Sequence, residues 1–131
     1  MSVERVNPAG LGRPSGFSHA VAVTGRRMVF LAGQTGYGPD GQIVAGGVVP
    51  QFQRALHNLL VALVAAGGQA ADLASLTIYV VSIEDYQAHA REIGAVWRDL
   101  AGTEYPAMAA VEVSRLWDAA ALVELQGIAA L

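Results

Sequence analysis

The hydrophobic positions of the chain follow two spacings, one typical of helices and the other typical of strands. From Phe52 to Val64, apolar residues recur every three or four positions, which predicts a helix with Pro50 in its first turn. Gly67 and Gly68 are the expected end of this helix, because glycine adopts a left-handed cap without strain. A second helix is predicted by a stripe of the same spacing, formed by Tyr86, Ala90, Ile93, Trp97 and Leu100.

Five shorter runs have the composition of strands. Residues 19–23 and 27–32 flank Thr24, Gly25 and Arg26, a combination that predicts a hairpin. Residues 76–81, 107–113 and 121–129 are the other three predicted strands, and the glycine-rich residues 36–41 form a turn. The order is hairpin, helix, strand, helix and two strands. It is typical of an α+β domain with both helices on one face of a mixed sheet.

The strand at residues 76–81 is apolar on both faces. Leu76 and Ile78 point to one side, and Tyr79 and Val81 point to the other. One face can pack on the helices, but the other needs a second cover, and in so short a chain that cover is expected to be another subunit. The composition agrees: 53% of the residues are hydrophobic and only 15% are charged.

Length and composition also exclude several classes of protein. The 131 residues predict a single domain over residues 1–131. The longest apolar run, residues 59–66, is too short to cross a membrane, and residues 1–14 lack the apolar stretch of a signal peptide. The absence of cysteine excludes disulfides and thiolate catalysis and fits a cytoplasmic location. A net charge of −3 without a basic run argues against a nucleic-acid partner.

Three segments stand at fixed places in this order. Residues 29–34 read VFLAGQ, and residues 65–68 read AAGG before the strand at 76–81. Residues 105–116 read YPAMAAVEVSRL, followed by LVEL at residues 122–125. Together they resemble the YjgF/RidA family of reactive-intermediate deaminases, also called L-PSP endoribonucleases, and the likeness runs over residues 6–129.

The resemblance implies a chorismate-mutase-like subunit, with a YjgF-type mixed sheet and two helices on one face. It also implies a homotrimer around a central barrel, with ligand sites in the clefts between subunits. The best-known members hydrolyse 2-imino acids and their enamine tautomers to 2-oxo acids and ammonia. They use no metal and no cofactor, so none is expected here.

Four polar positions of the family are apolar in this chain. Met108 stands where deaminating members have an arginine that clamps the substrate carboxylate, and methionine has no donor for that role. Ala110, Ala32 and Phe17 replace a common cysteine, serine and tyrosine. The pocket around residues 105–110 is therefore expected to be apolar and to suit a different ligand.

Two charged residues are open to two interpretations. Glu124 matches a family glutamate thought to hold the attacking water; alternatively it is an ordinary strand carboxylate that faces solvent or pairs with an arginine. Arg91 lies near the family's cleft edge and is either a relocated anion clamp or a solvated helix residue. Further ligand-binding candidates are His19, on a segment expected to border the cleft, and Gly33, Ala109 and Ala110, whose backbones would polarise the substrate.

The sequence thus predicts a homotrimer that binds a small, largely apolar metabolite between subunits. If it is an enzyme, it is a cofactor-free imine or enamine hydrolase but not a standard 2-imino acid deaminase. The alternative is a non-catalytic ligand-binding or regulatory trimer, and an endoribonuclease is the least favoured. His19, His57 and His89 lack metal-ligand spacing, so no metal site is predicted.

Overall fold

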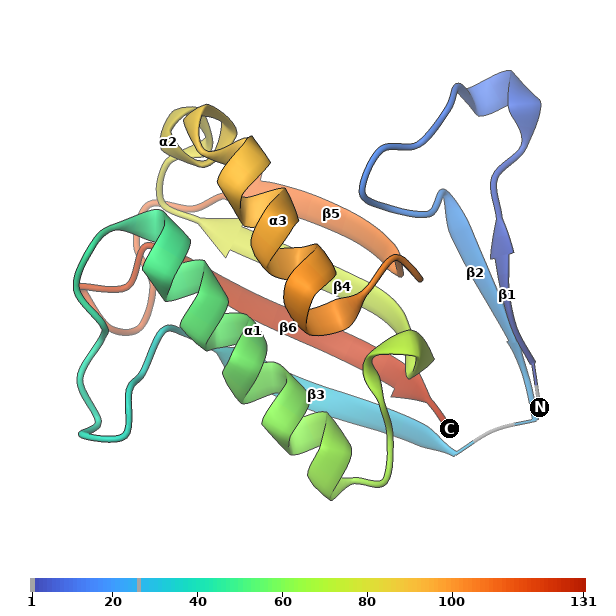
Figure 1. Ribbon diagram of the computed structural model, residues 1–131, viewed down its shortest axis with the longest axis horizontal. Helices are drawn as coiled ribbons and strands as arrows, with labels where there is room; N and C mark the ends of the chain where they lie inside the picture. The colour runs from blue at the N-terminus through green and yellow to red at the C-terminus, as the bar shows by residue number, and fades with distance from the viewer. Residues whose placement is uncertain (1, 26) are drawn as a thin grey trace.

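A computed structural model of the chain describes residues 2–25 and 27–131, whose arrangement is shown in Figure 1. In chain order the elements are β1 (Ser2–Val6), β2 (Ala20–Thr24), β3 (Met28–Gln34), α1 (Val48–Ala65), β4 (Leu73–Val80), α2 (Ile83–Ala88), α3 (Ala90–Ala101), β5 (Ala107–Glu112) and β6 (Val123–Ala130). Single turns of 3₁₀ helix lie at Ala9–Leu11 and Ala70–Asp72.

The main sheet is mixed and has the strand order β3-β6-β4-β5. β6 lies between β3 and β4 and is antiparallel to both, whereas β4 and β5 are parallel. The connection from β4 to β5 runs through α2 and α3, as a parallel pair requires. The α+β architecture with a mixed sheet is confirmed.

The predicted hairpin between residues 19–23 and 27–32 is wrong. β2 pairs with β1 in a separate two-stranded sheet, and β3 pairs with β6. Arg26, part of the expected turn, lies outside the described residues. Turn chemistry indicates where the chain changes direction, but the choice of a partner strand depends on tertiary packing. Pairing with β6 lets β3 bury Leu31 in the core.

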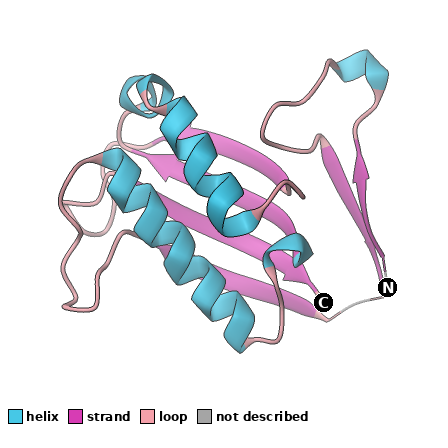
Figure 2. Ribbon diagram, viewed as in Figure 1, coloured by secondary structure: helices cyan, strands magenta, loops and turns pink. Residues whose placement is uncertain are grey.

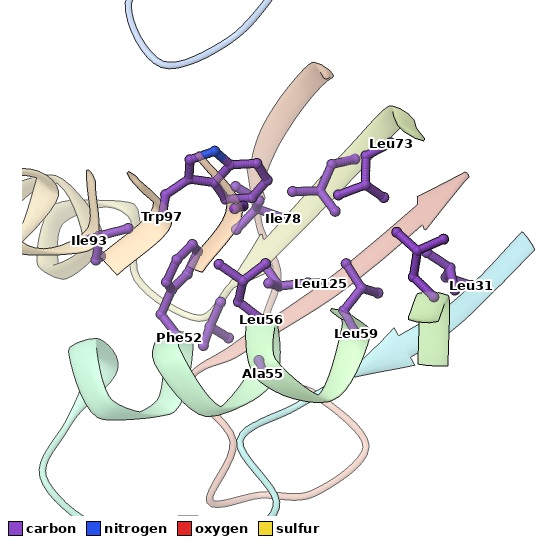
Figure 3. Packing of buried hydrophobic residues seen from close by; sticks show 14 of the residues in the cluster. Leu31, Phe52, Ala55, Leu56, Leu59, Leu73, Ile78, Ile93, Trp97 and Leu125 are labelled. Atoms are coloured by element: carbon purple, nitrogen blue, oxygen red, sulfur yellow. The ribbon is translucent and has the colours of Figure 1, made fainter. Parts of the chain in front are cut away.

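Both long helices cover the same face of the main sheet, as Figure 2 shows. α1 buries Phe52, Leu56, Leu59 and Leu63 on one side, at the spacing that the sequence predicts. These side chains pack on the sheet together with Trp97 of α3 (Figure 3). The single core therefore lies between α1, α3 and one face of the sheet.

The end of α1 agrees with its predicted glycine cap. Gly67 has a φ of 96° and donates its N–H to the Val64 carbonyl at 2.9 Å, while the Gly68 N–H bonds the Leu63 carbonyl at 3.0 Å. These two hydrogen bonds form a Schellman motif, and the positive φ favours glycine at position 67.

The second predicted helix is divided at His89 into α2 and α3. The His89 ring bonds the Asp85 carbonyl at 2.9 Å, so it occupies the acceptor that the His89 N–H would use in a continuous helix. That N–H bonds the Tyr86 carbonyl instead, at 3.1 Å. The side chain thus competes with the backbone and stops α2 there.

The other face of the main sheet has no helix over it (Figures 1 and 2). It carries Phe30, which is 73% exposed, and the partly exposed Tyr79 and Ile128. A large exposed aromatic on an uncovered sheet face is unusual for a monomer. Whether a second subunit covers this face stays a prediction. Among the described helices, none has both the length and the hydropathy needed to cross a membrane.

Candidate ligand cleft

A cleft of about 530 Å³ opens between α3, the end of β4 and the start of β5. We call it the α3 cleft. Its buried side chains are apolar and come from three elements: Phe52 of α1, Ile78 of β4, and Ile93 and Trp97 of α3. Half-buried Met108 of β5 lies beside them. Met108 thus lines a cleft with apolar side chains at its base, and two arginines line it as well.

Two aromatic pairs shape the wall of the α3 cleft. Trp97 stacks on Tyr105 with ring centroids 6.2 Å apart and an interplanar angle of 24°. Phe52 meets Tyr86 edge to face, also at 6.2 Å. Burial raises the pKa of Tyr86 to about 12, so its hydroxyl stays protonated at neutral pH and adds no negative charge to the cleft.

Arg91 and Arg98 also line the α3 cleft. They are seven residues apart on α3, which places them on one face of the helix two turns apart. Gly94 lies between them, and Arg98 folds back over it: Nη1 is 3.3 Å from the point where a Cβ on Gly94 would be. Of the described residues that line the cleft, none is acidic.

Glu124 lies on β6 directly beside Gly33 of β3. A Cβ added to Gly33 would meet the Glu124 carboxylate, so any larger residue there would force the Glu124 side chain to move. Glu124 is half-buried, and no described arginine forms an ion pair with it. The interpretation of Glu124 as one half of an ion pair therefore has no support in the described part of the chain.

Tyr37 and Asp118 lie close to this carboxylate. Tyr37 donates its hydroxyl to Asp118 Oδ2 at 3.1 Å. This hydrogen bond raises the pKa of Tyr37, with smaller contributions from desolvation and from the negative charges of Asp118 and Glu124. A neutral phenol and two carboxylates therefore share one edge of the molecule.

Met108 and Glu124 point to opposite faces of the sheet. Met108 is in register with Leu76 of β4, whose side chain is buried under the helices. Glu124 is in register with Tyr79 of β4, which points to the opposite face from Leu76 and Ile78. Since side chains alternate along a strand, Glu124 faces away from the α3 cleft. One chain therefore does not bring its Met108 and its Glu124 into a single site.

The remaining predicted ligand-binding residues lie around these two places. Exposed Ala32 precedes Gly33 on β3, near Glu124. Exposed Ala109 and Ala110 follow Met108 on β5, which is an edge strand of the main sheet. Neither Phe17 nor His19 lines the α3 cleft. Their rings meet edge to face with centroids 5.1 Å apart, and His19 Nε2 lies 3.0 Å from the Gly12 carbonyl oxygen.

Arg98 and Trp97 are cleft residues that the sequence analysis did not single out. Arg98 had a detectable signal, because it shares the helix face of Arg91. No sequence signal marked Trp97 as a cleft residue, since an apolar stripe predicts only that its ring is buried. Within residues 2–25 and 27–131, no group of three or more His, Asp or Glu side chains is placed to hold a metal ion.

Comparisons with known proteins identify the family of the chain. The family model described as Endoribonuclease L-PSP matches residues 11–131. A 2-iminobutanoate/2-iminopropanoate deaminase of Capra hircus is 33% identical over 123 residues, which are 93% of this chain and 82% of that protein. A RutC family protein of Pyrococcus abyssi is 33% identical over 114 residues, covering 86% and 84% of the two chains.

Solved structures give the same result. A crystal structure of YyfB from Yersinia pestis, a Rid-family protein of unknown function, superimposes with a TM-score of 0.89 at 32% identity, over 100% of both chains. The family match covers nearly the whole chain, and both curated relatives named above exceed 30% identity. The chain belongs to the YjgF/RidA family, the family also described as Endoribonuclease L-PSP.

Proposed function

We propose that the chain forms a homotrimer whose clefts, each built from two subunits, bind a small, largely apolar imine or enamine and hydrolyse it. The reaction adds water across the C=N bond and releases a carbonyl compound and ammonia. The proposal includes no cofactor, no nucleic acid and no membrane partner, and a cytoplasmic location. Free 2-imino acids are expected to be poor substrates.

The observation that carries the proposal is the position of Met108 and Glu124 on opposite faces of one sheet. A site that needs both residues requires a second subunit to bring its own Glu124 face against the α3 cleft. The uncovered sheet face with exposed Phe30 supports such an assembly. In this arrangement one subunit contributes Met108 and Arg91, and its neighbour contributes Gly33 and Glu124.

Glu124 has the surroundings that a water-holding carboxylate needs. It is half-buried, it packs against a glycine backbone, and no described arginine neutralises it. A carboxylate in that setting accepts a proton from water as the water attacks the imine carbon. Backbone N–H groups of β5 near Ala109 and Ala110, and of Gly33, would polarise the substrate.

Met108 explains why the substrate should differ from that of the deaminase relatives. A thioether offers contact area and no hydrogen-bond donor, so it cannot hold a carboxylate attached to the imine carbon. A substrate with an apolar group at that position would pack against Met108, Ile78 and Phe52 without leaving a buried charge unpaired.

A matched pair of imines tests this proposal. Oxidation of phenylalanine by an L-amino acid oxidase gives a 2-imino acid, and oxidation of 2-phenylethylamine by a flavin amine oxidase gives the same skeleton without the carboxylate. We expect the chain to accelerate ammonia release from the second imine more than from the first. Faster hydrolysis of the 2-imino acid would contradict the role given to Met108. Binding without acceleration of either imine would favour the non-catalytic alternative and overturn the hydrolase.

A further inference from the structure

The α3 cleft is apolar in its interior and purely cationic at its edge. Arg91 and Arg98 are the charged residues among those that line it, although the whole chain carries a net charge of −3. Acidic neighbours do not neutralise them, because Glu92 and Asp99 are one residue further along α3 and project from other sides of the helix. Neither guanidinium forms an ion pair with a carboxylate in the described part of the chain.

Trp97 lines the same cleft and carries an indole N–H that has no hydrogen-bond partner among the described residues. Its side chain is only 4% exposed, and its Nε1 is buried without a hydrogen-bond partner among the described residues. In Figure 3 the indole nitrogen lies on the edge of the ring that faces away from Phe52 and Leu56. A buried N–H without an acceptor is costly, and this one can gain an acceptor only if the packing around the indole shifts.

We infer that the α3 cleft binds a carboxylate with an apolar body, whose charge is held by Arg91 and Arg98 and whose body lies on the Trp97–Tyr105 pair. The inference rests on the proposed function in taking the α3 cleft as the ligand cleft, and it specifies the substrate class. Because the two guanidiniums project from α3 while Met108 lies on β5, the carboxylate is separated from the imine carbon by an apolar segment. Free 2-imino acids lack such a segment.

The arginine pair suits a carboxylate for two reasons. A guanidinium donates two parallel hydrogen bonds to a carboxylate, and two guanidiniums on one helix face can share the same anion. The stacked Trp97 and Tyr105 rings offer a flat apolar surface beside it. An aryl-alkyl carboxylate combines both features.

A fluorescence titration tests the inference without any turnover. The chain has two tryptophans, and Trp117 is 94% exposed, so Trp117→Phe leaves Trp97 as the only indole. In this background we expect 3-phenylpropanoate to change the Trp97 emission saturably. Its neutral analogue 3-phenylpropanamide should bind at least ~10-fold more weakly. Arg91→Gln and Arg98→Gln should each raise the Kd for the carboxylate about 10-fold.

Arg27→Gln is the matched control, because Arg27 is exposed and lies next to β3, at the edge of the sheet opposite to β5. It should leave the Kd unchanged. Glutamine is a good helix former, so the two α3 variants should keep the circular dichroism spectrum and melting temperature of the parent chain.

The outcomes separate this inference from the proposed function. Equal affinity for the amide and the carboxylate, or unchanged binding by both arginine variants, would overturn the inference and leave an apolar ligand cleft in place. If neither compound changed the Trp97 emission, while the imine of 2-phenylethylamine was still hydrolysed, the carboxylate site alone would be wrong. If neither compound bound and neither imine was hydrolysed, both proposals would fail.

Discussion

A Met108→Arg variant is expected to hydrolyse the 2-imino acid of phenylalanine with a kcat/KM roughly 10²-fold above that of the unmodified chain. Position 108 is on the helix-facing side of β5, in register with buried Leu76, so a side chain there lies in the α3 cleft. An arginine at this point could donate two hydrogen bonds to the substrate carboxylate. Such a charged pair stabilises the bound state by about 3 kcal/mol.

Two variants at the same position control this experiment. Met108→Leu keeps the apolar contact and should behave like the unmodified chain. Met108→Lys introduces the charge without the planar fork and should give a smaller gain than arginine. An unmodified chain that already hydrolyses the 2-imino acid as fast as Met108→Arg would refute the idea that this position decides the substrate.

Glu124→Gln, introduced into the Met108→Arg chain, is expected to lower kcat by roughly 10²- to 10⁴-fold while KM changes little. Glutamine has almost the same shape as glutamate, so it should still fit beside Gly33, but it cannot accept a proton from the attacking water. Steady-state ammonia release measures both constants. The small change in KM is essential, because a purely structural defect would weaken binding as well.

The matched control is Glu4→Gln on β1, which removes one exposed carboxylate from the separate two-stranded sheet of β1 and β2. It should leave both constants unchanged. Retention of kcat in the Glu124→Gln chain would instead assign Glu124 to the alternative role of an ordinary strand carboxylate.

Local signals in the sequence were sufficient for α1 and for the faces of the sheet, but they did not show the break between α2 and α3. The spacing of Phe52, Leu56, Leu59 and Leu63 identified the buried side of α1, because a helix repeats every 3.6 residues. The alternation in β4 identified a second apolar face, which the structure leaves without a helix. These features depend on residues that are near each other in the chain.

Strand pairing could not be obtained in the same way. Thr24 and Gly25 indicated a reversal, but β2 pairs with β1 and β3 with β6, which follows it by almost ninety residues. β1 itself gave little signal, because it contains the charged residues Glu4 and Arg5. Its Arg5 is used in the structure: the side chain bonds the Ala71 carbonyl at 2.8 Å and pairs with Glu104 at 3.2 Å.

The candidate site was predictable only in part for the same reason. The family motif located Met108 and Glu124 in the sequence. It could not show that the two side chains face opposite sides of one sheet, because that depends on the register of β4 with both β5 and β6. Arg91 was proposed as a relocated clamp, and the structure places it in one cleft with Met108 and Arg98. The clamp itself stays a prediction.

The central claim is that each site combines Met108 of one subunit with Glu124 of another, and a mixing experiment tests it directly. A chain carrying both Met108→Arg and Glu124→Gln should be inactive on the 2-imino acid alone, and so should the unmodified chain. When the two are coexpressed and assemble at random, about a quarter of the clefts combine the introduced arginine with an intact Glu124. We expect ammonia release to appear in the mixture. A mixture as inactive as its two components would rule out a site shared between subunits.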